Sequence, residues 1–190
     1  MNFFEVESIK EFAKKLHEQN VRKGFWEKEN SSFKQICLIN SELSEAVEGH
    51  RLDKHSGLKN YLNDADFDGY LNEASFIVNI KGSVEVELAD AWMRIVDWHY
   101  YLRIEKPRYE FKRFYFHNDW FGEDWHDGIC NITDSVLKIR EDESKTLESI
   151  SFARCAIEAF AEMLEIDLES YIKLKMRFNA TREKYHGKAY

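Results

Sequence analysis

Residues 84–104 read VEVELADAWMRIVDWHYYLRI, and this stretch decides the expected fold. Leu88, Ala91 and Ile95 recur at the spacing of one helix face, so the stretch predicts a long helix with a buried side. The helix must end before Pro107, the only proline in the chain, because the residue before a proline avoids helical backbone geometry.

The same helical period recurs on both sides of this stretch. It predicts further helices over about 6–21, 32–51, 124–140, 145–164 and from 168 onward, the last with Asp167 as its N-cap. Eight glycines and one proline are too few turn formers for a many-stranded β fold. We therefore expect one all-α domain over residues 1–190, a bundle of five or six helices. An Asp/Asn/Gly-rich insertion, 53–82, separates helices two and three, and the aromatic segment 107–123 has no clear period.

Composition limits the functional classes. The 35 acidic residues outnumber the 27 basic ones and give a formal charge of −8, which argues against a general nucleic-acid partner but permits divalent metals. No apolar run approaches the ~20 residues of a membrane span and no signal peptide is evident, so we expect a cytoplasmic protein without membrane contact. Cys37, Cys130 and Cys155 are widely spaced and odd in number, which favours core thiols over a zinc site or disulfides.

Two pairs of carboxylates are the strongest candidates for chemistry. Within each pair the residues are three apart, so both acids lie on one helix face at the margin of the apolar stripe. If the two helices pack together, the four acids converge, and such a group requires bound cations. Oxygen-only ligation points to Mg²⁺ or Mn²⁺ rather than zinc. The four residues are Glu42 and Glu45 on one helix and Glu87 and Asp90 on the other.

A solvated helix face is the alternative interpretation of these acids. It needs basic partners, for which Arg51 and Arg94 are available, and Arg94 shares the helix face of Glu87 and Asp90. The spacing does not distinguish the two interpretations.

The C-terminal region carries basic and amide side chains at helical spacing. Lys175, Asn179 and Arg182 are at i, i+4 and i+7 and share one helix face, where they suit phosphate oxygens. Lys188 in the following His-Gly-Lys sequence supplies a further cation. The alternative is an ordinary basic helix end favoured by the helix dipole.

In three blocks the chain resembles the MazG-like all-α nucleoside triphosphate pyrophosphohydrolases. The first block is Gly24-Phe25-Trp26 followed by residues 40–48, which are similar to the family's E-x-x-E helix and its aromatic lead-in. The second is residues 86–91, similar to its E-x-x-D helix. The third runs from Asp167 through Lys175 to residues 179–182 and 186–188, similar to its phosphate-binding segment.

The resemblance implies Mg²⁺-dependent hydrolysis of nucleoside or deoxynucleoside triphosphates to the monophosphate and pyrophosphate, in a homodimer or homotetramer. It implies that Glu42, Glu45, Glu87 and Asp90 hold the metal and that Glu45 orients the attacking water. It further implies phosphate binding by Lys175, Asn179, Arg182 and Lys188. Trp26 is the candidate for stacking on the base, with a core aromatic side chain as the alternative.

The chain departs from the family pattern in two places. Glu183 stands where many relatives have proline, and the insertion lengthens the connection between the two acidic helices. Within the insertion, Asp64, Asp66 and Asp68 are spaced like the first ligands of an EF-hand calcium loop. Position 12 of that loop is Ser75 instead of glutamate, so a solvated acidic loop is the alternative to Ca²⁺ binding.

Two other classes remain to be compared. A di-iron carboxylate bundle needs two E-x-x-H motifs, and the chain offers one, from Glu123 to His126. A non-catalytic helical regulatory or interaction bundle related to the family is the principal alternative to an enzyme.

Overall fold

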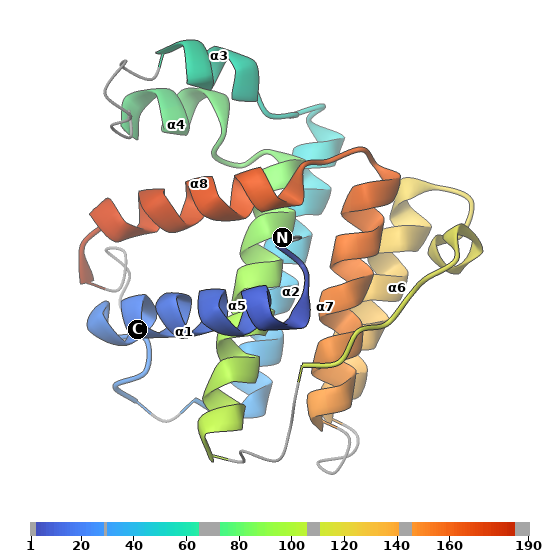
Figure 1. Ribbon diagram of the computed structural model, residues 1–190. Helices are drawn as coiled ribbons and strands as arrows, with labels where there is room; N and C mark the ends of the chain where they lie inside the picture. Colours follow the sequence, from blue (N-terminus) through green and yellow to red (C-terminus); the bar gives the residue numbers. More distant parts are fainter. Residues whose placement is uncertain (1–2, 29, 65–72, 106–110, 141–145, 185–190) are drawn as a thin grey trace.

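The computed structural model describes residues 3–28, 30–64, 73–105, 111–140 and 146–184. Within these ranges the regular structure is all helical, with eight α-helices and two short 3₁₀ helices (Figure 1). The elements in chain order are α1 (Val6–Arg22), α2 (Ser32–Arg51), α3 (Leu58–Asp64), α4 (Glu73–Asn79), α5 (Val84–Glu105), η1 (Asn118–Phe121), α6 (Trp125–Leu137), η2 (Lys138–Arg140), α7 (Thr146–Met163) and α8 (Leu168–Thr181).

The prediction of an all-helical protein is confirmed, and most expected boundaries lie within two residues of the observed ones. The helix expected over 124–140 ends at Leu137 and continues as the 3₁₀ turn η2. Asp167 caps α8 as predicted, because its carboxylate accepts a hydrogen bond from the Ser170 backbone N–H at 3.2 Å.

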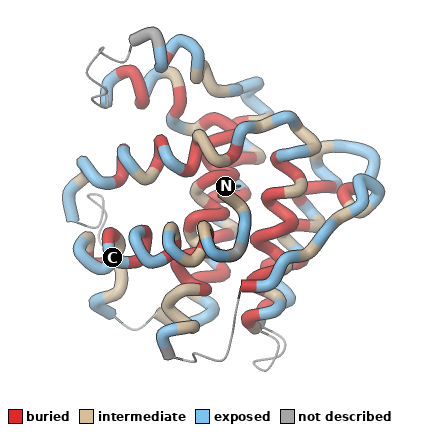
Figure 2. Tube along the Cα trace, viewed as in Figure 1, coloured by how far each residue is buried: buried red, intermediate tan, exposed pale blue. Residues whose placement is uncertain are grey.

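Helix α5 is the centre of the molecule. It packs against α1, α2, α7 and α8, and much of its length is buried (Figures 1 and 2). The three residues predicted for its buried face, Leu88, Ala91 and Ile95, are fully buried, and so is Trp92. In Figure 1, the axes of α2, α5, α6 and α7 are roughly aligned, while α1 and α8 cross in front of α5.

The contact between α2 and α5 is antiparallel and close. Gly49, near the end of α2, meets the start of α5: a Cβ atom built there lies 3.0 Å from the Gly82 carbonyl oxygen and 3.2 Å from the Val84 nitrogen. Towards the other end of the contact, Glu42 of α2 pairs with Arg94 of α5. Residue numbers therefore fall along α2 as they rise along α5, and the small residue at position 49 permits the close approach.

Helix α1 ends in a Schellman motif at Gly24. The Gly24 backbone has φ of 88°, its N–H bonds to the Val21 carbonyl, and the Phe25 N–H bonds to the Asn20 carbonyl. Left-handed geometry of this kind favours glycine. The turn reverses the chain and carries Trp26 back along α5, where its ring stacks on Tyr101.

The expectation that residues 53–82 form an irregular insertion is corrected in part, because α3 and α4 lie within it. Each of these helices has seven residues, too short for the apolar period to be evident in the sequence. Buried aromatic side chains attach them to the remainder of the fold: Tyr61 contacts Phe76, and Phe76 stacks on Phe178 of α8 at 4.0 Å. The helix count therefore exceeds the expected five or six.

The predicted burial of the cysteines is wrong for two of three. Cys37 and Cys130 are exposed, and only Cys155 is buried. Cys155 lies on α7 beside segment 111–116, where its sulfur accepts a hydrogen bond from the Phe114 N–H at 3.4 Å. The count and spacing of the thiols indicated that they are unpaired, whereas the face on which each lies is decided by helix packing.

A buried ion network joins α7 to α5 and to segment 111–116. Arg154 is fully buried and pairs with Glu158, which also accepts the indole N–H of Trp92 at 2.8 Å and a guanidinium N–H of Arg113 at 2.5 Å. Several donors on one carboxylate satisfy a charge that is costly to bury alone. None of the described helices is both long and apolar enough to cross a membrane.

His99 of α5 gives the fold a specific acid sensitivity. It is fully buried against Phe111, and its ring nitrogens have no hydrogen-bond partner among the described residues. Burial, together with the charges of Arg154 and Arg103, lowers the pKa of His99 from 6.5 to about 3. Between about pH 3 and pH 6.5, the unfolded chain therefore binds a proton on this histidine that the folded chain does not bind. The associated stability is complete above about pH 6.5 and is lost as the pH falls toward 3.

We predict that His99→Leu makes the free energy of unfolding less dependent on pH in the acid range. Urea unfolding between about pH 7.5 and pH 4.5 should show a smaller loss of stability for the variant than for the wild type. His117→Gln, at an exposed histidine, is the matched control and should retain the wild-type slope. Equal slopes for the His99 variant and the wild type would contradict the assignment.

Candidate functional site

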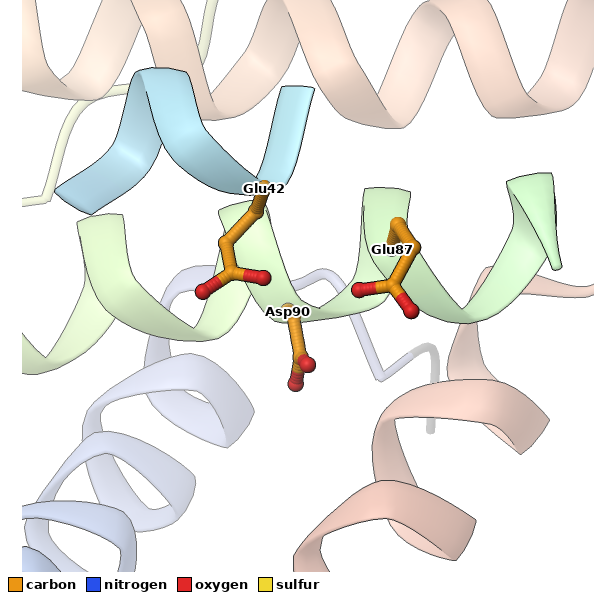
Figure 3. Close-up of side chains that lie close together, drawn as sticks. All are labelled: Glu42, Glu87 and Asp90. Atoms are coloured by element: carbon orange, nitrogen blue, oxygen red, sulfur yellow. The ribbon is translucent and has the colours of Figure 1, made fainter. Parts of the chain in front are cut away.

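Three carboxylates from two helices meet at the α2–α5 contact. Glu42 projects from α2, and Glu87 and Asp90 project from α5, with their carboxylates close together (Figure 3). One oxygen of each lies within 4.8 Å of those of the other two, a spacing at which a single cation could bridge them. Glu42 and Glu87 are buried. Glu45 is exposed but lines the same cavity.

Two basic side chains contact this cluster. Lys175 of α8 places Nζ 2.5 Å from an Asp90 oxygen. Arg94 of α5 contacts one oxygen of Glu42, Oε1, through two nitrogens. Its Nε donates a hydrogen bond to this oxygen at 2.6 Å, and its Nη2 lies 2.5 Å from the same oxygen. Each basic group thus neutralises a different carboxylate.

Glu87 is held by the start of its own helix. Its carboxylate accepts the Gly82 backbone N–H at 3.1 Å, while Ser83 bonds to the Val86 N–H and begins α5. Burial, together with the nearby Asp90 carboxylate, raises the pKa of Glu87 to about 8. Burial lowers the pKa of Lys175, but Asp90 and Glu87 together outweigh burial and raise it, so this lysine is charged.

The cluster lies in the wall of a cavity of about 320 Å³, within the size range of small-ligand sites. Two helices supply residues at regular intervals along it, because positions three, four and seven residues apart share one face. From α2 these are Lys34, Gln35, Leu38, Glu42 and Glu45, and from α5 they are Glu87, Asp90, Met93, Arg94 and Asp97. Since the helices are antiparallel, acidic residues line one end and Gln35 and Asp97 line the other.

The C-terminal residues expected to bind phosphate line the same cavity. Lys175 and Asn179 are buried residues of α8, and the Asn179 Oδ1 atom has no hydrogen-bond partner among the described residues. Arg182 also lines the cavity, but it is the residue at which α8 ends, with extended backbone, so the expected single helix face is interrupted there. Lys188 is outside the described residues.

The end of the cavity remote from the acids is built around Asp97. Its carboxylate accepts hydrogen bonds from His17 Nδ1 at 2.6 Å, Asn20 Nδ2 at 2.7 Å and the Trp26 indole N–H at 3.0 Å. The Trp26 ring stacks on Tyr101 with centroids 4.3 Å apart. Trp26 is partly buried and lines the cavity, so it combines a core contact with access to a ligand.

Sequence reasoning did not identify Asp97, Gln35 and His17 as site residues. Asp97 follows Asp90 by seven residues, and Gln35 precedes Glu42 by seven, so each continues the acidic face of its helix by two turns. That spacing was the available signal. The proposed calcium ligands Asp66 and Asp68 lie outside the described residues, and of Asp64 only the backbone, at the end of α3, is described.

The chain matches no protein-family model, no curated protein and no solved structure in the comparisons made.

The raised pKa of Glu87 predicts that the metal-free protein loses stability in alkali. The folded state holds a proton on Glu87 up to about pH 8, whereas the ordinary pKa of this carboxyl group is 4.5. The associated stability is present below about pH 4.5 and is lost as the pH rises through 8. With a chelator present, Glu87→Gln should raise the melting temperature above about pH 8 by several degrees and change it little in acid.

The control is Glu48→Gln on α2, where an exposed glutamate pairs only with exposed Arg51. This variant should follow the wild-type profile. If the melting temperature of the Glu87 variant depends on pH as that of the wild type does, the raised pKa of Glu87 is contradicted.

Proposed function

We propose that the chain is a Mg²⁺-dependent nucleoside triphosphate pyrophosphohydrolase of the MazG-like kind, acting in the clearance of nucleotides from the cellular pool. The observation that carries the proposal is the composition of one cavity. Clustered carboxylates lie at one end, an aromatic side chain lies at the other, and Lys175, Asn179 and Arg182 share the wall. A metal-complexed triphosphate joined to a flat base needs these groups together.

The donor set fits Mg²⁺, or Mn²⁺ in its place. The candidate ligands Glu42, Glu87 and Asp90 offer only oxygen, and Glu45 at the wall adds a further carboxylate. The pKa of Glu87, about 8, reflects burial beside other acids, an arrangement that a divalent cation relieves. When bound, the metal supplies charge neutralisation for the phosphates and lowers the pKa of water.

The chain's own residues then have separate roles. Exposed Glu45 orients the water for in-line attack on the α-phosphorus. Lys175, Asn179 and Arg182 donate to phosphate oxygens and offset the charge of the departing pyrophosphate, with Lys188 as a further proposed donor. Trp26, held by Asp97 and Tyr101, offers a surface on which the base can stack.

A non-catalytic helical regulatory bundle is the second candidate, and the ion pairs favour it. Arg94 with Glu42 and Lys175 with Asp90 make a network that needs no metal. These two pairs leave Glu87 without an ion-pair partner among the described residues, and the buried Asn179 Oδ1 atom stays unsatisfied. Both facts support a ligand and therefore the enzyme.

Incubation with a panel of ribo- and deoxyribonucleoside triphosphates and Mg²⁺ tests the proposal. We expect pyrophosphate and the monophosphate as the first products, and no turnover without metal. Glu42→Gln and Asp90→Asn should each abolish turnover and leave the helical circular dichroism intact.

Glu48→Gln, on the exposed side of α2, is the matched control and should retain activity. Orthophosphate as the first product would exclude attack at the α-phosphorus. Activity retained in both acid variants would exclude the metal assignment, and inactivity on the whole panel would favour the regulatory bundle.

We further propose that the helices form one bundle-type domain over residues 1–190, with 53–82 as an insertion, in a cytoplasmic homodimer or homotetramer. Exposed apolar side chains on α3 and α4 support self-association: Leu62, Ile77 and Val78 are 60%, 51% and 76% exposed. Neighbouring apolar groups left in water at this density are typical of contact surfaces.

Val78→Asp should therefore shift the protein toward the monomer, because burying the carboxylate in an apolar interface is costly. Light scattering coupled to size exclusion measures the mass, and Lys59→Asp on α3 controls for added charge. A monomeric wild-type protein would contradict the proposed assembly.

A further inference from the structure

Two basic side chains are positioned within the proposed metal site rather than beside it. We propose that Arg94 and Lys175 are resident counterions, which neutralise the carboxylates while no metal is bound and leave them for the phosphates of the ligand when the metal arrives. This inference rests on the proposed function and adds to it the order in which metal and triphosphate bind. It also assigns Arg94 a role in the site.

The two ion pairs divide the cluster between them. Arg94 reaches from α5 to Glu42 on α2 and uses two nitrogens on the same oxygen, Oε1. Lys175 reaches from α8 to Asp90 on α5. Three helices are therefore joined through the carboxylates that the proposed metal requires, and each cation contacts a different ligand.

A divalent ion bound to these carboxylates would lie close to both cations. Like charges at contact distance in a partly buried site repel strongly, because the surrounding medium screens them far less than water does. The Lys175 and Asp90 side chains are 8% and 15% exposed, so little water is present to weaken this repulsion. Metal binding must therefore move both basic groups off the carboxylates or be opposed by them.

The cavity provides a destination for the displaced cations. Both side chains line it, together with Asn179, and Arg94 lies on α5 between the acidic end and Asp97. A triphosphate bound through the metal would bring phosphate oxygens along this wall, and a guanidinium or ammonium group pairs readily with them. In the absence of a triphosphate, the other carboxylates in the wall are Glu45 and Asp97, and Asp97 already accepts three hydrogen bonds.

The consequence is coupling between the two ligands. Free metal must compete with Arg94 and Lys175 and binds weakly, whereas metal together with a triphosphate gives every charge a partner. By thermodynamic linkage each ligand then raises the affinity for the other.

Binding of Mn²⁺ to the full chain, followed by the electron paramagnetic resonance signal of free Mn²⁺, tests this. For the wild type we expect weak binding of Mn²⁺ alone and about tenfold or tighter binding with an α,β-methylene deoxynucleoside triphosphate. Arg94→Gln removes the competitor, so it should bind Mn²⁺ alone several-fold more tightly and gain less from the analogue. Lys175→Met should behave in the same way.

Arg94→Lys retains the charge and should restore weak binding of Mn²⁺ alone, which protects the test if the glutamine variant folds poorly. Arg51→Gln, at an exposed ion pair on α2, is the matched control and should leave Mn²⁺ affinity unchanged. Weaker or unchanged affinity for Mn²⁺ alone in Arg94→Gln would overturn the inference, and weaker affinity would make Arg94 a positioning residue for Glu42.

The same measurement separates this inference from the proposed function. If the triphosphate analogue tightens Mn²⁺ binding but the protein releases no pyrophosphate, the counterion inference stands and the proposed hydrolase activity is wrong. If the protein hydrolyses triphosphates but binds Mn²⁺ equally well with and without the analogue, the proposed hydrolase activity stands and the counterion inference is wrong.

Discussion

The close antiparallel contact between α2 and α5 is the constraint on which the remainder of the structure depends. Gly49 lets the end of α2 lie against the backbone of Gly82 and Val84. This contact sets the register of the two helices, and the register brings Glu42 opposite Asp90 and Arg94. A shift of one residue rotates a helix face by about 100° and would separate these groups.

This register places different kinds of charged residue at successive positions along the cavity. Acidic residues lie beside the start of α5, Arg94 follows, and Asp97 lies about 10 Å beyond Asp90 at a rise of 1.5 Å per residue. Helices α1 and α8 cross α5 and cover the cavity. They bring Asn20, Lys175 and Asn179 to its wall. Helices α2, α5 and α8 thus bring acidic, basic and amide groups to one cavity.

Buried charge is managed in two different ways in this protein. On the α7 side, Glu158 receives donors from Arg154, Arg113 and Trp92. On the α2 side, the carboxylates outnumber their basic partners, and the pKa of Glu87 is raised to about 8. Since an uncompensated buried charge costs several kcal/mol, Glu158 keeps its charge among its donors, whereas Glu87 holds a proton at neutral pH.

The sequence alone determined the helical class, six of the eight described α-helices, the Asp167 cap and the pairing of acids on two helix faces, because these follow from local spacing. The short helices α3 and α4 were not evident, since seven residues show too little of the period and Phe76 depends on Phe178 for its partner. Tertiary structure alone decided that Glu45 is exposed while Glu42 is buried, that Arg94 contacts Glu42, and that Asp97 gathers three donors. These outcomes depend on the register and crossing of helices distant in sequence, and local spacing does not specify either.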